Sequence, residues 1–155
     1  MSVLDLAWSN DYALGIDVID EQHRRLFAYF EEIDNAISEG SEVKVTAVVH
    51  GLVEYAISHN SFEEELMDKA GYPYLDDHRK VHESFKARAN KYVRRLEGNA
   101  DPFKVAEQVR IYLGLWLMSH VKKDDRDYVP YVKKIIKSKR RLPIPLPAFL
   151  RGTRH

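Results

Sequence analysis

The sequence predicts an all-α protein: an up-down-up-down four-helix bundle with an N-terminal arm and a basic, proline-containing C-terminal tail. Apolar residues recur with the 3.6-residue period of a helix over four segments of about 20 residues. The links between these segments are short and contain glycine, proline, asparagine or aspartate, which end helices and form turns. No segment has the alternating pattern of a long strand. Because short links join antiparallel neighbours, we expect the helices to run up and down.

Capping residues and glycines predict where the helices begin and end. Residues 1–18 read as an irregular arm with a turn at Gly15, and the carboxylate of Asp20 is a candidate N-cap for the first helix. Gly40 is a typical C-terminal glycine, Ser41 a candidate cap of the second helix, and Asp101 a cap of the fourth. The expected helices run from Ile19 or Asp20 to about Ser38, from Glu42 to about Lys69, from Tyr74 or Leu75 to about Glu97, and from Pro102 through His120, with a further short helix over residues 126–138.

The composition is that of one globular domain. The chain has 155 residues, 45% hydrophobic and 31% charged, which is enough to form a full core. It has no cysteine, so disulfides and thiolate ligands are excluded, and any metal must bind histidine and oxygen donors. No basic leader and no apolar run long enough to span a bilayer is visible. We expect a cytoplasmic monomer that does not bind nucleic acid.

The charge is distributed unevenly along the chain. The net charge is zero, but residues 133–155 contain eight of the 24 basic residues and no acidic residue. The first 132 residues therefore carry a net charge of −8. Three prolines, Pro143, Pro145 and Pro147, prevent a helix in the basic segment. We expect a bundle over residues 1–138 and an extended basic tail over residues 139–155.

Histidines lie on the apolar stripes of all four helices. The set is His23, His59, His78, His82 and His120. Glu63 follows His59 by four residues and therefore shares its face. A single histidine on such a face is most often a hydrogen-bonded core residue, and a buried carboxylate costs several kcal/mol unless it is paired. Together, five imidazoles and a carboxylate exceed the needs of one zinc ion and suit two metal ions bridged by carboxylates.

Two residues compete to supply a second bridging carboxylate. Asp124 and Asp125 both follow His120. On a straight helix Asp124 shares the face of His120, whereas Asp125 is rotated away by about 140°. Geometry therefore favours Asp124, and Asp125 fits only if the helix ends or unwinds just after His120. An exposed charged turn would place neither residue at the metal.

Four motifs follow one another over about residues 6–130, and their order and spacing are compared below with those of a known family. They read LAWSNDYALGIDVIDEQHRRL, HNSFEEELM, GYPYLDDHRKVHESF and WLMSHVKKDDRDY. This set resembles the hemerythrin family, including the single-domain bacterial hemerythrins. The resemblance implies a four-helix bundle that binds O2 reversibly at two iron ions joined by an oxo or hydroxo bridge.

The resemblance also implies a role for each candidate residue. His78, His82 and His120 resemble the ligands of the iron whose coordination is filled. His23 and His59 resemble those of the iron with an open position. Glu63 and Asp125 resemble the two bridging carboxylates, so the family pattern prefers Asp125 to Asp124. The residues near the O2 position would be Asn60, Trp116, Leu117 and Val121, and Asn60 departs from the family, which usually has phenylalanine there.

The function expected from this resemblance is O2 carriage, storage or delivery without catalysis. The alternatives are a di-iron enzyme that activates O2 or peroxide, and an O2 sensor that acts through a partner. Carboxylate-rich di-iron enzymes use repeated Glu-x-x-His pairs, which this chain lacks. A sensor would need an output module. The basic tail is a candidate contact for an O2-consuming client protein or an anionic surface.

Overall fold

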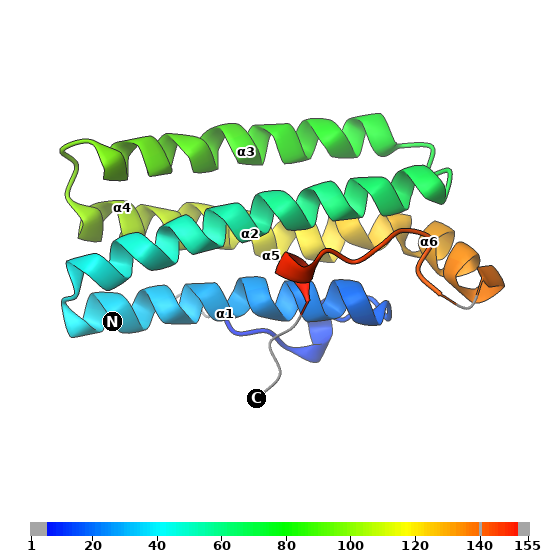
Figure 1. The fold of residues 1–155 in the computed structure, drawn as a ribbon, viewed down its shortest axis with the longest axis horizontal. Coiled ribbons are helices and arrows are strands. Elements are labelled where there is room, and N and C mark those ends of the chain that lie inside the picture. The colour runs from blue at the N-terminus through cyan, green and yellow to red at the C-terminus, as the bar shows by residue number, and fades with distance from the viewer. Residues whose placement is uncertain (1–5, 140, 152–155) are drawn as a thin grey trace.

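The computed structural model describes residues 6–139 and 141–151, and all the regular secondary structure of these residues is helical (Figure 1). The first three long helices are α1 (Asp17–Glu39), α2 (Glu42–Lys69) and α3 (Leu75–Glu97). The fourth consists of α4 (Pro102–Gln108), a π-helical turn η2 (Val109–Leu113), α5 (Gly114–His120), a second π-helical turn η3 (Val121–Asp125) and α6 (Arg126–Lys139). Short 3-10 helices, η1 (Asn10–Tyr12) and η4 (Ala148–Leu150), lie in the arm and the tail. The predicted up-down-up-down four-helix bundle is confirmed.

Most of the predicted helix ends follow from local capping. Gly40 has φ 66°, and its N–H donates to the carbonyls of Ala36 and Ile37. The Ser41 hydroxyl accepts a hydrogen bond from the Lys44 N–H at 3.2 Å and caps α2. Asp101 caps α4 in the same way.

The prediction that Asp20 caps the first helix is wrong. Helix α1 already begins at Asp17, and Ile16 at its N-cap makes no side-chain hydrogen bond. The Asp20 carboxylate instead accepts from the backbone N–H groups of Leu14 at 2.8 Å and Gly15 at 3.1 Å. It therefore fixes the arm that leads into the helix, where Gly15 has φ 83°.

The fourth helix is longer than predicted and is not regular. Helical backbone continues from Pro102 to Lys139, so α6 follows η3 directly and is not a separate element. The turns η2 and η3 each widen the helix by using hydrogen bonds to the fifth residue instead of the fourth. Pro130 lies inside α6, where it removes one backbone hydrogen bond.

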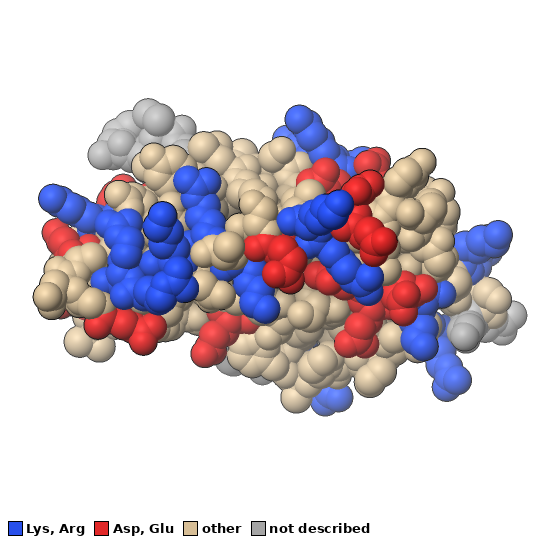
Figure 2. All heavy atoms as spheres, turned by 90° about the horizontal axis from the view of Figure 1, so that it is seen from above, with Lys and Arg blue, Asp and Glu red and all other residues tan. Residues whose placement is uncertain are grey.

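The apolar stripes of the four helices meet in one continuous core. Residues at the centre of this core, such as Phe27, Ile33, Val49, Ala89 and Val109, have 2% of their surface exposed or less. None of the described helices is long and apolar enough to cross a membrane. On the face seen in Figure 2, basic side chains gather at the end where α3 finishes, and acidic side chains lie mainly toward the end where it begins.

Residues 141–151 of the tail fold back onto the bundle (Figure 1). Ile144 and Leu150 are buried, and the ring of Phe149 lies 5.7 Å from that of Tyr55 on α2. Arg141 and Arg151 remain exposed. Arg140 and residues 152–155 lie outside the described residues, and the boundary between bundle and tail at residue 138 stays a prediction.

Candidate metal centre

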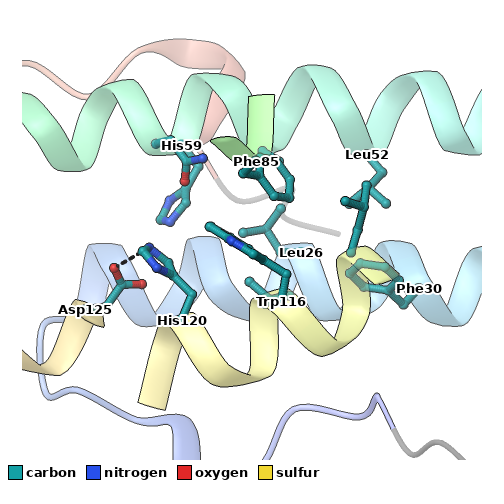
Figure 3. A pocket seen from close by; sticks show the side chains of 12 residues that line it. Leu26, Phe30, Leu52, His59, Phe85, Trp116, His120 and Asp125 are labelled. Atoms are coloured by element: carbon teal, nitrogen blue, oxygen red, sulfur yellow. Dashed lines mark ion pairs between the residues drawn. The ribbon is translucent and has the colours of Figure 1, made fainter. Parts of the chain in front are cut away.

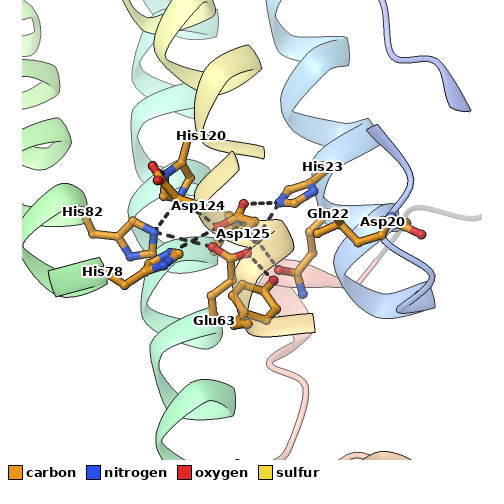
Figure 4. A network of polar contacts seen from close by, with 12 residues as sticks. Asp20, Gln22, His23, Glu63, His78, His82, His120, Asp124 and Asp125 are labelled. Atoms are coloured by element: carbon orange, nitrogen blue, oxygen red, sulfur yellow. Dashed lines mark hydrogen bonds and ion pairs between the residues drawn. The ribbon is translucent and has the colours of Figure 1, made fainter. Parts of the chain in front are cut away.

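The seven side chains predicted at the metal converge inside the bundle (Figure 3 and Figure 4). They form two groups, and in each group one atom from every residue lies within 4.8 Å of the others. The first group is Glu63, His78, His82, His120 and Asp125; the second is His23, His59, Glu63 and Asp125. All seven residues are buried. The two carboxylates belong to both groups and therefore lie between the two sets of histidines.

The carboxylate oxygens face histidines on both sides. Asp125 Oδ2 is 3.2 Å from His23 Nε2, and Asp125 Oδ1 is 3.2 Å from His78 Nε2 and 2.9 Å from His120 Nε2. Glu63 Oε1 is 3.2 Å from His59 Nε2 and 3.6 Å from His82 Nε2. Each carboxylate thus spans the two groups, which is the position of a bridging ligand.

Several atoms at the centre have no hydrogen-bond partner among the described residues. They are His23 Nε2, His78 Nε2, Glu63 Oε1 and both carboxylate oxygens of Asp125. In addition, His82 Nε2 and His120 Nε2 face each other at 3.0 Å. Carboxylates lie at the Nδ1 atoms of both rings, so in two neutral imidazoles the protons would be on Nδ1 and the two Nε2 lone pairs would face each other. Buried polar atoms normally have partners. Metal ions between these atoms would satisfy all of them, so the donor set fits a di-iron site.

The π-helical turn η3 explains why Asp125 reaches the cluster. Each residue of a regular helix turns by about 100°, so the fifth residue after His120 points away from it. The wider turn absorbs one extra residue, and Asp125 takes the place that a straight helix gives to Asp124. Asp124 is displaced outward, has 45% of its side chain exposed, and accepts from His120 Nδ1 at 2.9 Å. The structure thus places Asp125, and not Asp124, within the cluster.

A second set of residues, missed by the sequence analysis, contacts the outer nitrogens of the histidines. Gln22 Oε1 lies 2.5 Å from His59 Nδ1, and Glu64 Oε2 lies 2.9 Å from His82 Nδ1. Together with Asp124, they hold the Nε2 atoms toward the centre. The Tyr128 hydroxyl donates to Glu63 Oε2 at 2.6 Å. Gln22, Glu64 and Asp124 are sequence neighbours of cluster residues, which is the one signal that identifies them.

The cluster keeps its carboxylates ionised. Burial raises the pKa of Glu63 and of Asp125, but the surrounding histidines outweigh burial and lower both pKa values. Burial lowers the pKa of His23, but Asp125 and Glu63 raise it to about 9; Asp125 and Asp124 likewise raise that of His120 to about 10. The pKa of His82 falls to about 3, mainly through burial. Metal binding must therefore displace protons from some of these imidazoles.

A small apolar cavity adjoins the cluster (Figure 3). Its volume is about 10 Å³, close to what one water-sized molecule needs. Of the predicted pocket residues, Asn60, Trp116 and Leu117 line it, whereas Val121 is fully buried and is not part of its wall. The cluster residues in the wall are His59, His120 and Asp125, and apolar residues that the sequence analysis did not identify complete it: Leu26, Phe30, Leu52, Ala56, Phe85 and Leu113. The Trp116 ring stacks on His120 with centroids 4.3 Å apart.

A four-helix bundle with five inward imidazoles and two shared carboxylates defines a class of protein, the bundles that hold a metal pair in their core. Residues 14–132 match the family described as Hemerythrin HHE cation binding domain. The chain is 38% identical over 128 residues to a bacteriohemerythrin of Stenotrophomonas maltophilia, covering 83% of this chain and 82% of the relative. It belongs to the hemerythrin family.

Other relatives agree with this placement. A bacteriohemerythrin of Pseudomonas aeruginosa is 35% identical over 128 residues, with the same shares of each chain covered. Among solved structures, a hemerythrin variant with tyrosine in place of a leucine aligns with a TM-score of 0.72, covering 85% of this chain and 98% of that chain. At 19% identity, that similarity supports the fold alone.

Proposed function

We propose that the protein binds O2 reversibly at a di-iron centre and serves as an O2 carrier, store or delivery protein. The observation that carries this proposal is the apolar cavity of about 10 Å³ whose wall includes His59, His120 and Asp125. The cavity has room for a very small molecule directly beside the cluster. The family membership supports the same function, because the matched residues 14–132 include all seven donors and the resemblance to hemerythrins implies O2 binding.

The two groups of donors support a specific ligand assignment. His78, His82 and His120 would hold one iron ion, and His23 and His59 would hold the other. Glu63 and Asp125 would bridge them, because their oxygens face histidines of both groups. The ion held by His23 and His59 would have fewer protein donors and would therefore keep a position free for a ligand.

A pair of ferrous ions would supply electrons to O2 when it binds and would take them back when it leaves. The protein's own contribution is to orient the donors and to keep water away. Gln22, Glu64 and Asp124 hold imidazoles through their Nδ1 atoms, and Tyr128 holds Glu63. Leu26, Phe30 and Leu113 line the cavity with apolar surface, which excludes water and the protons that water carries.

The cavity also favours carriage over catalysis. Apart from members of the metal cluster, none of its described lining residues is an acid or a base, and Asn60 is the one further polar residue. General acid–base catalysis needs a titratable group within reach of the substrate. An organic substrate does not fit a space of about 10 Å³.

The expected cellular role is that of a cytoplasmic monomer that supplies O2 to a client. The tail offers a contact for such a client, because Ile144 and Leu150 anchor it to the bundle while Arg141 and Arg151 stay exposed. An acidic partner surface would be attracted to these charges, more strongly at low salt.

An absorption spectrum tests the proposed function. The anaerobic ferrous protein is exposed to air and then returned to vacuum, while an electrode follows the O2 concentration. A carrier gives new charge-transfer bands in air that disappear under vacuum, with O2 uptake that stops at one molecule per iron pair. The same chain loaded with zinc is the control and gives neither. Continuous consumption of O2 with a reductant would identify an enzyme instead.

A further inference from the structure

The metal cluster is enclosed, so an iron ion needs a route to it. All seven cluster residues have at most 4% of their surface exposed. A cavity of about 350 Å³ opens from the surface at the beginning of α3 and reaches the cluster at His78. Tyr72, Tyr74, Asp77, Asp124 and Asp127 form the rest of its polar wall. We call it the acidic cavity.

The acidic cavity is suited to attract cations. Three carboxylates line it, and none of its described lining residues is a lysine or an arginine. Burial raises the pKa of the Tyr72 hydroxyl, and the negative charge of Asp127 and Asp124 raises it further. The tyrosine thus experiences the negative potential that an approaching cation would meet.

His78 connects this cavity to the centre of the cluster. Its Nε2 points at Asp125 Oδ1, 3.2 Å away. No described residue contacts its Nδ1 through a hydrogen bond, in contrast to the Nδ1 atoms of His59, His82 and His120. The side chain is 96% buried, since its exposed fraction is 4%, and it forms part of the cavity wall. A buried imidazole in the cavity wall whose Nδ1 makes no described hydrogen bond is a donor for an arriving metal ion.

The other cavities next to the cluster are poor routes for an ion. The apolar cavity offers almost no polar wall to a hydrated cation. A polar cavity of about 70 Å³ reaches His82, but its two acidic residues, Glu64 and Glu83, are accompanied by Lys86. Glu64 also pairs with Arg79 at 3.4 Å. These cations reduce the attraction for a metal ion.

We propose that the acidic cavity is the iron-loading site of the protein. Asp77 and Asp127 collect a hydrated ferrous ion at its mouth, and His78 receives the ion at the inner wall and passes it to the cluster. The inference rests on the proposed di-iron centre. It assigns a function to Asp77 and Asp127, which contact none of the seven cluster residues through a described ion pair or hydrogen bond.

The rate of iron uptake tests the proposal. Full-length protein is stripped of metal with a chelator and mixed anaerobically with Fe²⁺, and a coloured ferrous chelator reports the free ion over time. The test protein carries Asp77→Asn and Asp127→Asn. The control protein carries Asp76→Asn and Glu83→Gln, which remove the same charge outside the acidic cavity. Electrostatic attraction changes association rates by about 10-fold or more. We expect the test protein to load at least about fivefold more slowly than the control at low salt, with the difference shrinking as salt rises.

The final iron content separates this result from damage to the cluster. Both proteins should reach the wild-type iron content, and Asp77→Glu with Asp127→Glu should restore the rate. Equal loading rates in the test and control proteins would overturn the loading site, as would a slow test protein that the glutamate variant fails to restore. If the wild-type protein itself binds no iron pair, the proposed di-iron centre fails, and this is seen before any variant is compared.

Discussion

The two halves of the cluster are held in different ways. In the half with three histidines, anionic side chains contact the outer nitrogens: Glu64 at His82 and Asp124 at His120. In the half with two histidines, the amide of Gln22 contacts His59, and His23 Nδ1 has no partner among the described residues. An anionic partner makes an imidazole a stronger donor than a neutral one does. In the proposed di-iron centre, the first half would therefore hold its ion more firmly than the second, which offers fewer and weaker donors.

The cavities beside the two halves also differ in polarity. The half with three histidines adjoins the acidic cavity through His78 and the small polar cavity through His82. In the half with two histidines, His23 is fully buried, and His59 lines the apolar cavity, which His120 of the other half also lines. Polar surface outside one ion allows charged species to approach, whereas apolar surface beside the other favours a small neutral molecule. This division of roles fits a protein that loads iron from one side and binds O2 on the other.

The largest effect is expected from Glu63→Ala, because Glu63 belongs to both halves. The substitution removes the oxygen that faces His59 and His82, and with it one of the two proposed bridging charges. We expect loss of the iron pair, measured as iron per chain after desalting. Glu65→Ala, an exposed neighbour, is the control and should keep both ions. Two tightly held irons in the Glu63 variant would refute the assignment.

A graded effect is expected from three substitutions that separate the halves. Asp125→Ala removes a shared oxygen donor and should cause loss of the pair. Asp124→Ala removes only the partner of His120 and should weaken metal binding by about 10- to 100-fold. Gln22→Ala removes a neutral partner and should have a smaller effect than Asp124→Ala. Titration with a competing chelator measures all three.

The order of these effects matters more than their size. A greater loss in the Asp124 variant than in the Asp125 variant would restore the straight-helix argument and contradict the role of η3. A greater loss in the Gln22 variant than in the Asp124 variant would contradict the comparison between the two halves.

Metal removal should lower the stability of the whole bundle. The seven proposed ligands come from all four long helices, so the ions connect the helices in the native state alone. A structural metal contributes several kcal/mol, and 1 kcal/mol shifts the melting temperature of a chain of this size by about 2–4 °C. We expect the metal-free protein to melt more than about 10 °C lower, by circular dichroism. Equal melting temperatures would show that the bundle alone fixes the cluster.

The regular parts of this molecule were predictable because their causes are local. Apolar periodicity predicted four helices, and Gly40, Ser41 and Asp101 predicted helix ends, since each acts within a few residues. The inward position of the five histidines followed from the same period.

The remaining features depend on contacts between helices. Gln22 on α1 meets His59 on α2, and Glu64 on α2 meets His82 on α3, pairs that spacing along one helix cannot show. The turn η3 is similar, because residues 121–125 carry no glycine or proline that would predict a wider turn. The family pattern predicted the position of Asp125, and helix geometry required the helix to end or unwind after His120. The structure shows that a π-helical turn meets this requirement.

The smallest expected effect concerns Asn60, the polar residue in the wall of the apolar cavity. It has 6% of its surface exposed and also lines the polar cavity near Glu64 and His82. Its amide therefore lies between the apolar cavity and the polar cavity, and it can let water pass from the polar cavity toward the proposed O2 position. Asn60→Phe should close this passage and slow the oxidation of the O2 complex to the ferric pair. A neutral hydrogen bond is worth about 0.5–1.5 kcal/mol, so we expect a roughly two- to tenfold longer lifetime.

A second substitution separates polarity from volume. Asn60→Ala removes the amide without filling the space, and it should leave more room for water than Asn60→Phe does. The decay of the O2 absorption band is followed for the three proteins at one pH. The phenylalanine ring has little room in a cavity of about 10 Å³, so that variant should also lose about 1–3 kcal/mol of stability. Equal lifetimes in all three proteins would show that Asn60 does not control water. A shorter lifetime in both variants would mean that the amide protects bound O2 by donating a hydrogen bond. The O2 complex would then be stabilised by a polar contact as well as by the exclusion of water.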